Sequence, residues 1–379
     1  MMERRKNLND KFGFVDSMKI KDFIDYEQPN EYIVESDRYN IKYSTPVLTA
    51  GQSFILGYTN ESKGIYKKGP CIIFDDFTTS VHYVDFPFKV KSSAMKILTT
   101  KSNTDLKYCY YLLLSLSKMP PNHKRQWIST TSEKTHELPS MDKQIAIVKK
   151  LDLISDTIAI YTNQIENLDN LVKARFIEMF GDPQINEKGF TKAPMGEYLS
   201  LLTDFSSNGS YKALDSGVVM YDEPNYAWMV RTTDLESGDK SSIKYIDEKA
   251  YELLSKSKIF GGEIIMNKIG SAGKIYIIPK LTMPASLGRN AFMFRYDERI
   301  NNIFIYYLLT SDYGQREIQQ YVRGAVTKTI TKDDARAVLI IVPPLELQQQ
   351  FADFVHQVDK SRFDIKKSII ELEREVVYD

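Results

Sequence analysis

Cysteine is scarce in this chain of 379 residues, which contains only Cys71 and Cys109. The two lie far apart in the sequence, and neither has a cysteine or histidine nearby at metal-ligand spacing. The sequence therefore argues against a disulfide framework and a zinc site. We expect both residues to be free thiols in a reducing cytoplasm.

Long hydrophobic runs are also missing. No window of about 18 apolar residues is present, so we expect no membrane span. The first seven residues, MMERRKN, do not begin an apolar signal segment, which argues against secretion. These absences favour a cytoplasmic protein.

The chain has no excess of charge of either sign, because it contains 50 basic and 50 acidic residues. A lone DNA-binding domain is usually basic, since phosphate contacts supply much of its affinity. A neutral chain can still bind DNA if its basic residues gather on one face or if partners complete the groove.

No catalytic pattern stands out either. Residues 119–122 (MPPN) lack the flanking residues of an amino-methyltransferase motif, and no glycine-rich adenosylmethionine loop follows a strand. Residues 270–274 (GSAGK) lack the spacing of a phosphate loop and favour a turn between strands. Asp75–Asp76 has no accompanying nuclease signature and favours a polar turn. The histidines form no metal-spaced cluster; they are His82, His123, His136 and His356.

What the chain does contain is an internal repeat. Residues 138–144 (LPSMDKQ) match 342–348 (VPPLELQ) in pattern, with the two glutamines 204 residues apart. An apolar series in steps of three and four residues follows each glutamine. The first includes Ile147, Leu151, Ile154, Ile158, Ile165 and Leu168, and the second Phe351, Val355, Val358, Ile365, Ile369 and Leu372.

Such steps keep one stripe on one helix face, as in a coiled coil. Gly181 and Pro183 are expected to end the first helix, and the second is expected to begin after Pro343–Pro344. Only Arg362 interrupts the second stripe. We predict two long antiparallel helices packed on each other; the alternative is two surface helices with ordinary core stripes.

The segments before each long helix are predicted to be mixed α/β. Short runs rich in β-branched and aromatic residues predict strands, and a short helix follows in each segment, over residues 105–117 and 303–313. The strand-like runs are 53–58, 71–74 and 83–90, then 227–231, 263–268, 274–278 and 290–295. The predicted fold class is α+β: two mixed α/β domains joined by two long antiparallel coiled-coil helices, with a pseudo-twofold internal repeat.

Several segments resemble the specificity subunits of type I restriction–modification enzymes. Residues 171–182 (LVKARFIEMFGD) resemble the end of the family's central helix, and the repeated lead-ins with Gln144 and Gln348 resemble the starts of both helices. Residues 45–51 with 55–59 resemble one class of target recognition domain, and 262–274 with 323–330 resemble another. One departure is that the second helix stops at Asp379 without a second Phe-Gly-Asp ending.

The resemblance implies target recognition domains at 1–138 and 183–343, and helical spacers at 139–182 and 344–379. It implies a non-catalytic subunit that reads a bipartite, asymmetric site in double-stranded DNA. Two modification subunits would carry the methyltransferase centre, and up to two restriction subunits the motor and nuclease. S-adenosylmethionine, ATP and Mg would bind those partners, and this chain would hold no cofactor or metal.

Candidate DNA contacts are long polar or aromatic side chains on loops, because such groups reach phosphates and base edges. They are Lys124, Arg125, Gln126 and Trp127 in the first domain, and Lys274, Arg289, Asn290, Arg323 and Lys328 in the second. The alternative for the first group is a solvated loop. Two rival functions remain at this point: a coiled-coil adaptor that binds only proteins, and a fused restriction–methylation enzyme.

Overall fold

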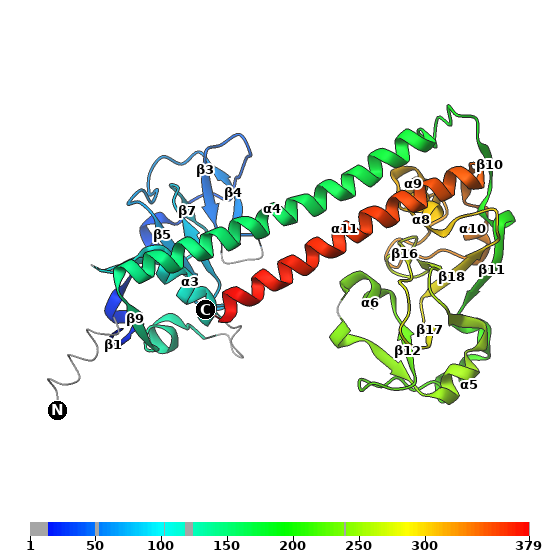
Figure 1. Ribbon diagram of the computed structural model, residues 1–379. Coiled ribbons are helices and arrows are strands. Elements are labelled where there is room, and N and C mark those ends of the chain that lie inside the picture. Colours follow the sequence, from blue (N-terminus) through cyan, green and yellow to red (C-terminus); the bar gives the residue numbers. More distant parts are fainter. Residues whose placement is uncertain (1–13, 50–52, 102, 118–123, 239, 379) are drawn as a thin grey trace. The chain divides into compact units, whose positions relative to one another are not determined.

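The computed structural model describes residues 14–49, 53–101, 103–117, 124–238 and 240–378 (Figure 1). The chain forms two compact units. The first comprises residues 1–162 and 367–379, and the second comprises residues 163–366.

The first unit is built on two small sheets. One is antiparallel, with the order β2 (Ile24–Glu27), β8 (Met95–Thr100), β5 (Cys71–Asp75) and β6 (Val81–Val84). The other has the order β4 (Ile55–Thr59), β3 (Thr45–Leu48) and β7 (Lys89–Val90), with β3 and β7 parallel. Successive side chains of a strand point to opposite faces, so β5 serves two cores. Ile72 and Phe74 pack with helix α3 (Leu106–Leu116), and Cys71 and Ile73 pack toward β7.

The second unit repeats this plan. Its antiparallel sheet has the order β11 (Leu199–Asp204), β18 (Ala291–Tyr296), β15 (Ile264–Asn267) and β16 (Ile275–Ile277). Its other sheet has the order β13 (Lys244–Ile246), β12 (Ala227–Val230), β17 (Ala285–Leu287) and β14 (Lys258–Ile259), with β12 and β17 parallel. The helices are α5 (Tyr211–Gly217), α6 (Thr232–Ser237), α7 (Glu248–Leu253), α8 (Asn302–Thr310), α9 (Asp312–Gln319) and α10 (Lys332–Ala337).

The correspondence extends to the strands beside the long helices. In each unit an early strand pairs antiparallel with the strand that leads into a long helix. The pairs are β1 (Phe14–Lys19) with β9 (Thr135–Pro139), and β10 (Thr191–Pro194) with β19 (Leu339–Val342). The internal repeat predicted from the sequence is confirmed in the order of strands and helices.

The two long helices are α4 (Met141–Phe180) and α11 (Leu345–Tyr378) (Figure 1). In the second unit, Phe176 of α4 packs on Phe351 of α11 with ring centroids 5.4 Å apart. Earlier along α4, Asp169 meets Arg362 farther along α11 at 2.5 Å. The contacts advance in opposite directions along the two helices, so these segments are antiparallel, as predicted.

The predicted stripe is most deeply buried near the domains. Five of its members are buried: Leu151, Ile154, Phe351, Val355 and Val358. The others are partly exposed: Ile147, Ile158, Ile165, Leu168, Ile365, Ile369 and Leu372. Arg362, which interrupts the stripe, pairs with Asp169 of α4 and with Asp359 of its own helix. An ion pair between the helices therefore replaces an apolar contact at this level.

A fully buried glutamine stands at the start of each long helix. The Oε1 atom of Gln144 accepts the Asp105 N–H at 2.8 Å, and its Nε2 donates to the Pro139 carbonyl at 2.8 Å. Gln348 makes the equivalent bonds to the Asn301 N–H and the Pro343 carbonyl, both at 2.8 Å.

Both N–H donors belong to helix-capping residues. Asp105 caps α3 and Asn301 caps α8, so each glutamine ties a long helix to the short helix of its own domain. We call Gln144 and Gln348, with these bonds, the glutamine clamps.

Two predicted elements are divided in the structure. The run 83–90 is not one strand, because β6 ends at Val84 and β7 begins at Lys89, with Pro87 in between; proline has no N–H for a sheet ladder. The helix expected over 303–313 is two helices, because the Ser311 side chain accepts the Gly314 N–H and begins α9. The assignment of 1–138 and 183–343 as recognition domains stays a prediction.

Other expectations concern thiols and membranes. Cys71 and Cys109 are buried free thiols, as predicted, and burial raises the pKa of Cys71 to about 12. Among the residues that the structure describes, no helix is long and apolar enough to cross a membrane.

We predict that Gln348→Leu lowers the free energy of unfolding by about 3 kcal/mol, because the Asn301 N–H and the Pro343 carbonyl are left buried without partners. Gln350→Leu is the matched control, since Gln350 is exposed on the same helix, and its effect should stay within about 0.5 kcal/mol. Urea denaturation of both variants measures the difference. Equal stability of the two variants would contradict a role for the clamp.

Candidate nucleic-acid interface

Three loops meet at one edge of the second unit. They are the β15–β16 turn (268–274), the segment 288–290 and the loop 323–329. The Gly270 N–H donates to the Lys328 carbonyl at 2.9 Å, and the Lys268 N–H donates to the Asn290 carbonyl at 2.9 Å. We call these three loops the basic rim. It brings together all five second-domain candidates, each of them exposed: Lys274, Arg289, Asn290, Arg323 and Lys328.

The loop 323–329 is closed tightly at its base. Arg323 and Thr329 exchange backbone hydrogen bonds of 2.9 and 2.8 Å. Gly324 has φ +107°, and a Cβ atom there would lie 2.1 Å from the Thr327 carbonyl oxygen. Only glycine fits such a position. The tight turn leaves Val326 98% exposed, between Arg323 and Lys328 in the sequence.

Three of the exposed rim cations are paired with acids. Lys274 pairs with Glu236, Arg289 with Asp215 at 3.1 Å, and Arg323 with Asp334 at 2.9 Å. The hydrogen bond that Lys274 donates to Glu236 raises the pKa of Lys274. Exposed ion pairs of this kind contribute little free energy, so these cations can also bind a group of the DNA at small cost.

A buried carboxylate joins one rim loop to the start of helix α10, which follows the loop 323–329. Asp204, at the end of β11, accepts hydrogen bonds from Lys268 and Lys332, both at 2.8 Å. Burial alone would raise the pKa of Asp204, but these bonds and those from Ser206 and Ser207 hold it well below its usual range. No sequence pattern indicates this cluster, because 64 residues separate Asp204 from Lys268 and 128 separate it from Lys332.

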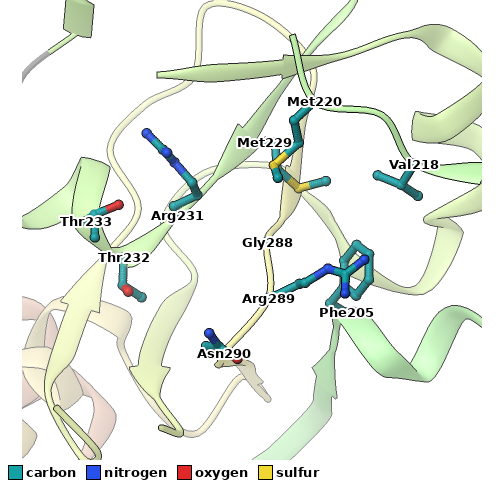
Figure 2. A pocket seen from close by; sticks show the side chains of 10 residues that line it. All are labelled: Phe205, Val218, Met220, Met229, Arg231, Thr232, Thr233, Gly288, Arg289 and Asn290. Atoms are coloured by element: carbon teal, nitrogen blue, oxygen red, sulfur yellow. The ribbon is translucent and has the colours of Figure 1, made fainter. Parts of the chain in front are cut away.

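A pocket of about 330 Å³ opens beside the basic rim (Figure 2). Its wall combines apolar side chains, hydroxyl groups and two arginines. The lining residues are Phe205, Val218, Met220, Met229, Arg231, Thr232, Thr233, Gly288, Arg289 and Asn290.

The first-domain candidates divide into two pairs. Lys124 and Arg125 are exposed, but Gln126 and Trp127 are buried, with Trp127 only 1% exposed. The Trp127 ring packs against Phe74 at 5.2 Å between centroids. Trp127 is thus a core residue. Because both side chains are buried, the candidate interface does not include Gln126 or Trp127.

The carboxylate of Asp76 holds the segment of Gln126 and Trp127 in the core. Its Oδ1 accepts the N–H groups of Gln126 and Trp127 at 3.0 and 2.8 Å, and its carboxylate pairs with buried Lys96 at 3.0 Å. Asp75 accepts the Phe77 N–H at 2.8 Å. The Asp75–Asp76 pair is thus a polar turn after a strand, as the sequence favours, and Asp76 also anchors the Trp127 segment.

Of the remaining motifs, one is a turn between strands and another lies outside the described residues. Residues 270–274 form the turn between β15 and β16. Residues 50–51 and 118–123, which include the segment 119–122 and His123, lie outside the described residues. Within the described part of the chain, no three His, Cys, Asp or Glu residues are placed to hold a metal ion.

The duplicated fold is similar to that of a solved structure. Its architecture is similar to that of the type I restriction–modification S subunit from M. genitalium, with a TM-score of 0.56 at 15% identity over 95% of this chain and 93% of that one. Residues 200–374 match the family described as "Type I restriction modification DNA specificity domain".

Sequence similarity extends over most of the chain. This chain is 32% identical over 362 residues to the specificity subunit of the type I restriction enzyme EcoR124I/EcoR124II of Escherichia coli. The match covers 91% of this chain and 87% of that protein. The chain is 23% identical to the MjaVIII specificity subunit of Methanocaldococcus jannaschii, covering 90% and 85%. The chain belongs to the family of type I restriction enzyme specificity subunits.

We predict that Asp204→Asn destabilises the second unit by about 2 kcal/mol at pH 7, because Lys268 and Lys332 lose their charged partner. The pKa of Asp204 is lower in the folded state, so its ionisation stabilises the fold above the unfolded pKa of about 3.9. The deficit of the variant should therefore shrink as the pH falls below about 4.

Denaturation of both proteins between pH 3 and 7 measures this deficit. Asp222→Asn is the control, since Asp222 is largely exposed in its pair with Lys244. A deficit of the same size at pH 3 and pH 7 would contradict the ionic role of Asp204.

Proposed function

We propose that this protein recognises a specific sequence in double-stranded DNA for a type I restriction–modification complex. The observation that carries the proposal is the basic rim, where three loops gather arginine, lysine and asparagine side chains at one exposed edge. These are the side chains that bind phosphates and base edges in the major groove. Family membership supports the same function.

The recognised site is bipartite and asymmetric. Each repeat of the scaffold would read one half-site, and the repeats differ in their loops, so the half-sites differ. Domains that bind one face of DNA are spaced by about one helical turn, about 34 Å. The 40 residues of α4 extend for about 60 Å, so the long helices are long enough to set that spacing.

The chemistry resides on partner subunits. Two modification subunits bind S-adenosylmethionine and methylate DNA, and up to two restriction subunits use ATP and Mg. This chain acts as a non-catalytic guide without a cofactor of its own. Its zero net charge supports a further division of labour, in which the partners add phosphate contacts around the duplex.

The long helices offer a surface for these partners. Several large apolar side chains on them are exposed, away from the packing stripe: Leu153, Ile160 and Leu171 on α4, and Phe363 and Ile370 on α11. Leu153 and Ile160 are 68% and 58% exposed, and a heptad step separates them. A row of this kind fits an apolar helix or groove of a modification subunit.

The test is selection from a randomised DNA duplex library by the complex of this chain with its modification subunits. The expected result is two short, unequal blocks of preferred bases with a constant gap. An adaptor that binds only proteins would enrich no sequence, and that outcome would overturn the proposal. Methyl transfer by the isolated chain would instead favour a fused enzyme.

We predict that lengthening both helices lengthens the gap in the recognised site. Seven residues inserted between Ile158 and Ile165 of α4, and seven after Ile365 of α11, preserve the phase of the stripe. They add about 10 Å, or about three base pairs. The same selection measures the gap, and Gln164→Ala, at an exposed polar position of α4, is the control of unchanged length. An unchanged gap in the lengthened protein would contradict the role of the helices as a spacer.

A further inference from the structure

We propose that Arg289 and Asp215 together read one G·C base pair in the half-site of the second domain. The inference rests on the proposed function and deepens it, because it assigns a base contact to two named side chains. It follows from the backbone that holds Arg289, from the surroundings of its guanidinium and from the acid beside it.

The backbone around Arg289 is held in place on both sides. The Gly288 N–H donates to the Val230 carbonyl at 2.8 Å, and a Cβ atom at Gly288 would lie 2.8 Å from that oxygen. Asn290 has φ +66°, and its carbonyl accepts the Lys268 N–H at 2.9 Å. Arg289 therefore projects from a segment fixed to β12 and to the β15–β16 turn.

The guanidinium lies against aromatic rings at the mouth of the pocket. It is 4.9 Å from the Phe205 ring centroid and 5.6 Å from that of Tyr211, and Figure 2 shows it beside Phe205. The side chain is 41% exposed, so it is ordered but accessible. Arginine held in this way loses little conformational entropy on binding, and its parallel N–H groups match the O6 and N7 acceptors of guanine.

Asp215 completes the pattern. It accepts a hydrogen bond from one nitrogen of Arg289 at 3.1 Å and is itself 58% exposed. Arginine has five N–H donors, so others remain for a base. A carboxylate accepts from the N4 amino group of cytosine. Donors beside an acceptor complement the major-groove edge of a G·C pair, whereas a carboxylate beside the arginine disfavours a phosphate.

The same domain contains a matched arginine elsewhere. Arg299 stacks on Tyr198 at 4.3 Å and pairs with Asp297 at 2.7 Å. It lies just before α8, where its guanidinium also donates to the Glu197 carbonyl at 2.6 Å. Arg299→Ala removes an equally stacked and paired cation from outside the basic rim.

The experiment compares the selected sequences of complexes that contain wild-type chain, Arg289→Ala, Arg289→Lys, Asp215→Asn or Arg299→Ala. Both Arg289 variants should lose about tenfold to a hundredfold discrimination at one G·C pair of one half-site. Asp215→Asn should relax the same pair, while the other half-site keeps its preference. Arg299→Ala should select the wild-type sequence.

Three outcomes would overturn the assignment. Unchanged selection by the Arg289 variants would show that Arg289 reads no base. A uniform loss of affinity for all sequences, with a reduced salt dependence, would make Arg289 a phosphate contact. Absence of sequence selection by the wild-type complex would overturn the proposed function as well. The retained half-site and thermal denaturation of each variant show that the complex is folded and assembled.

Discussion

The glutamine clamps are the contacts on which the rest of the architecture depends. A helix can set the distance between two half-sites only if each domain is fixed at its end. Gln144 and Gln348 supply that fixation, because one amide both accepts the N–H of a helix cap and donates to the carbonyl before the long helix. Glutamate lacks the donor and leucine lacks both groups, so the position requires an amide of this length.

Around these clamps the two units keep the same strand order and differ in their loops. In the second unit, Asp204 ties one loop of the basic rim and the start of α10 to the sheet through Lys268 and Lys332. In the first unit, Asp76 instead draws the segment of Trp127 into the core. The shared framework therefore positions different surfaces in the two units.

The sequence predicts the framework well because the framework is periodic and duplicated. The glutamine offset and the apolar stripe locate both long helices without reference to any distant contact. The site is harder to predict, because burial depends on residues remote in the sequence. Trp127 looks like a stacking residue, yet Asp76 and Phe74 place it in the core. Arg289 is a candidate because it is a long polar side chain on a loop, but no pattern links it to Asp215, 74 residues away.

We propose that each scaffold repeat reads its own half-site while the clamps and helices stay common. The most direct measurement exchanges residues 183–343 for the corresponding domain of another specificity subunit and maps methylated adenines in cells that express the assembled complex. We predict one new half-site, one unchanged half-site and the original gap between them. A change in both half-sites, or a changed gap, would contradict it.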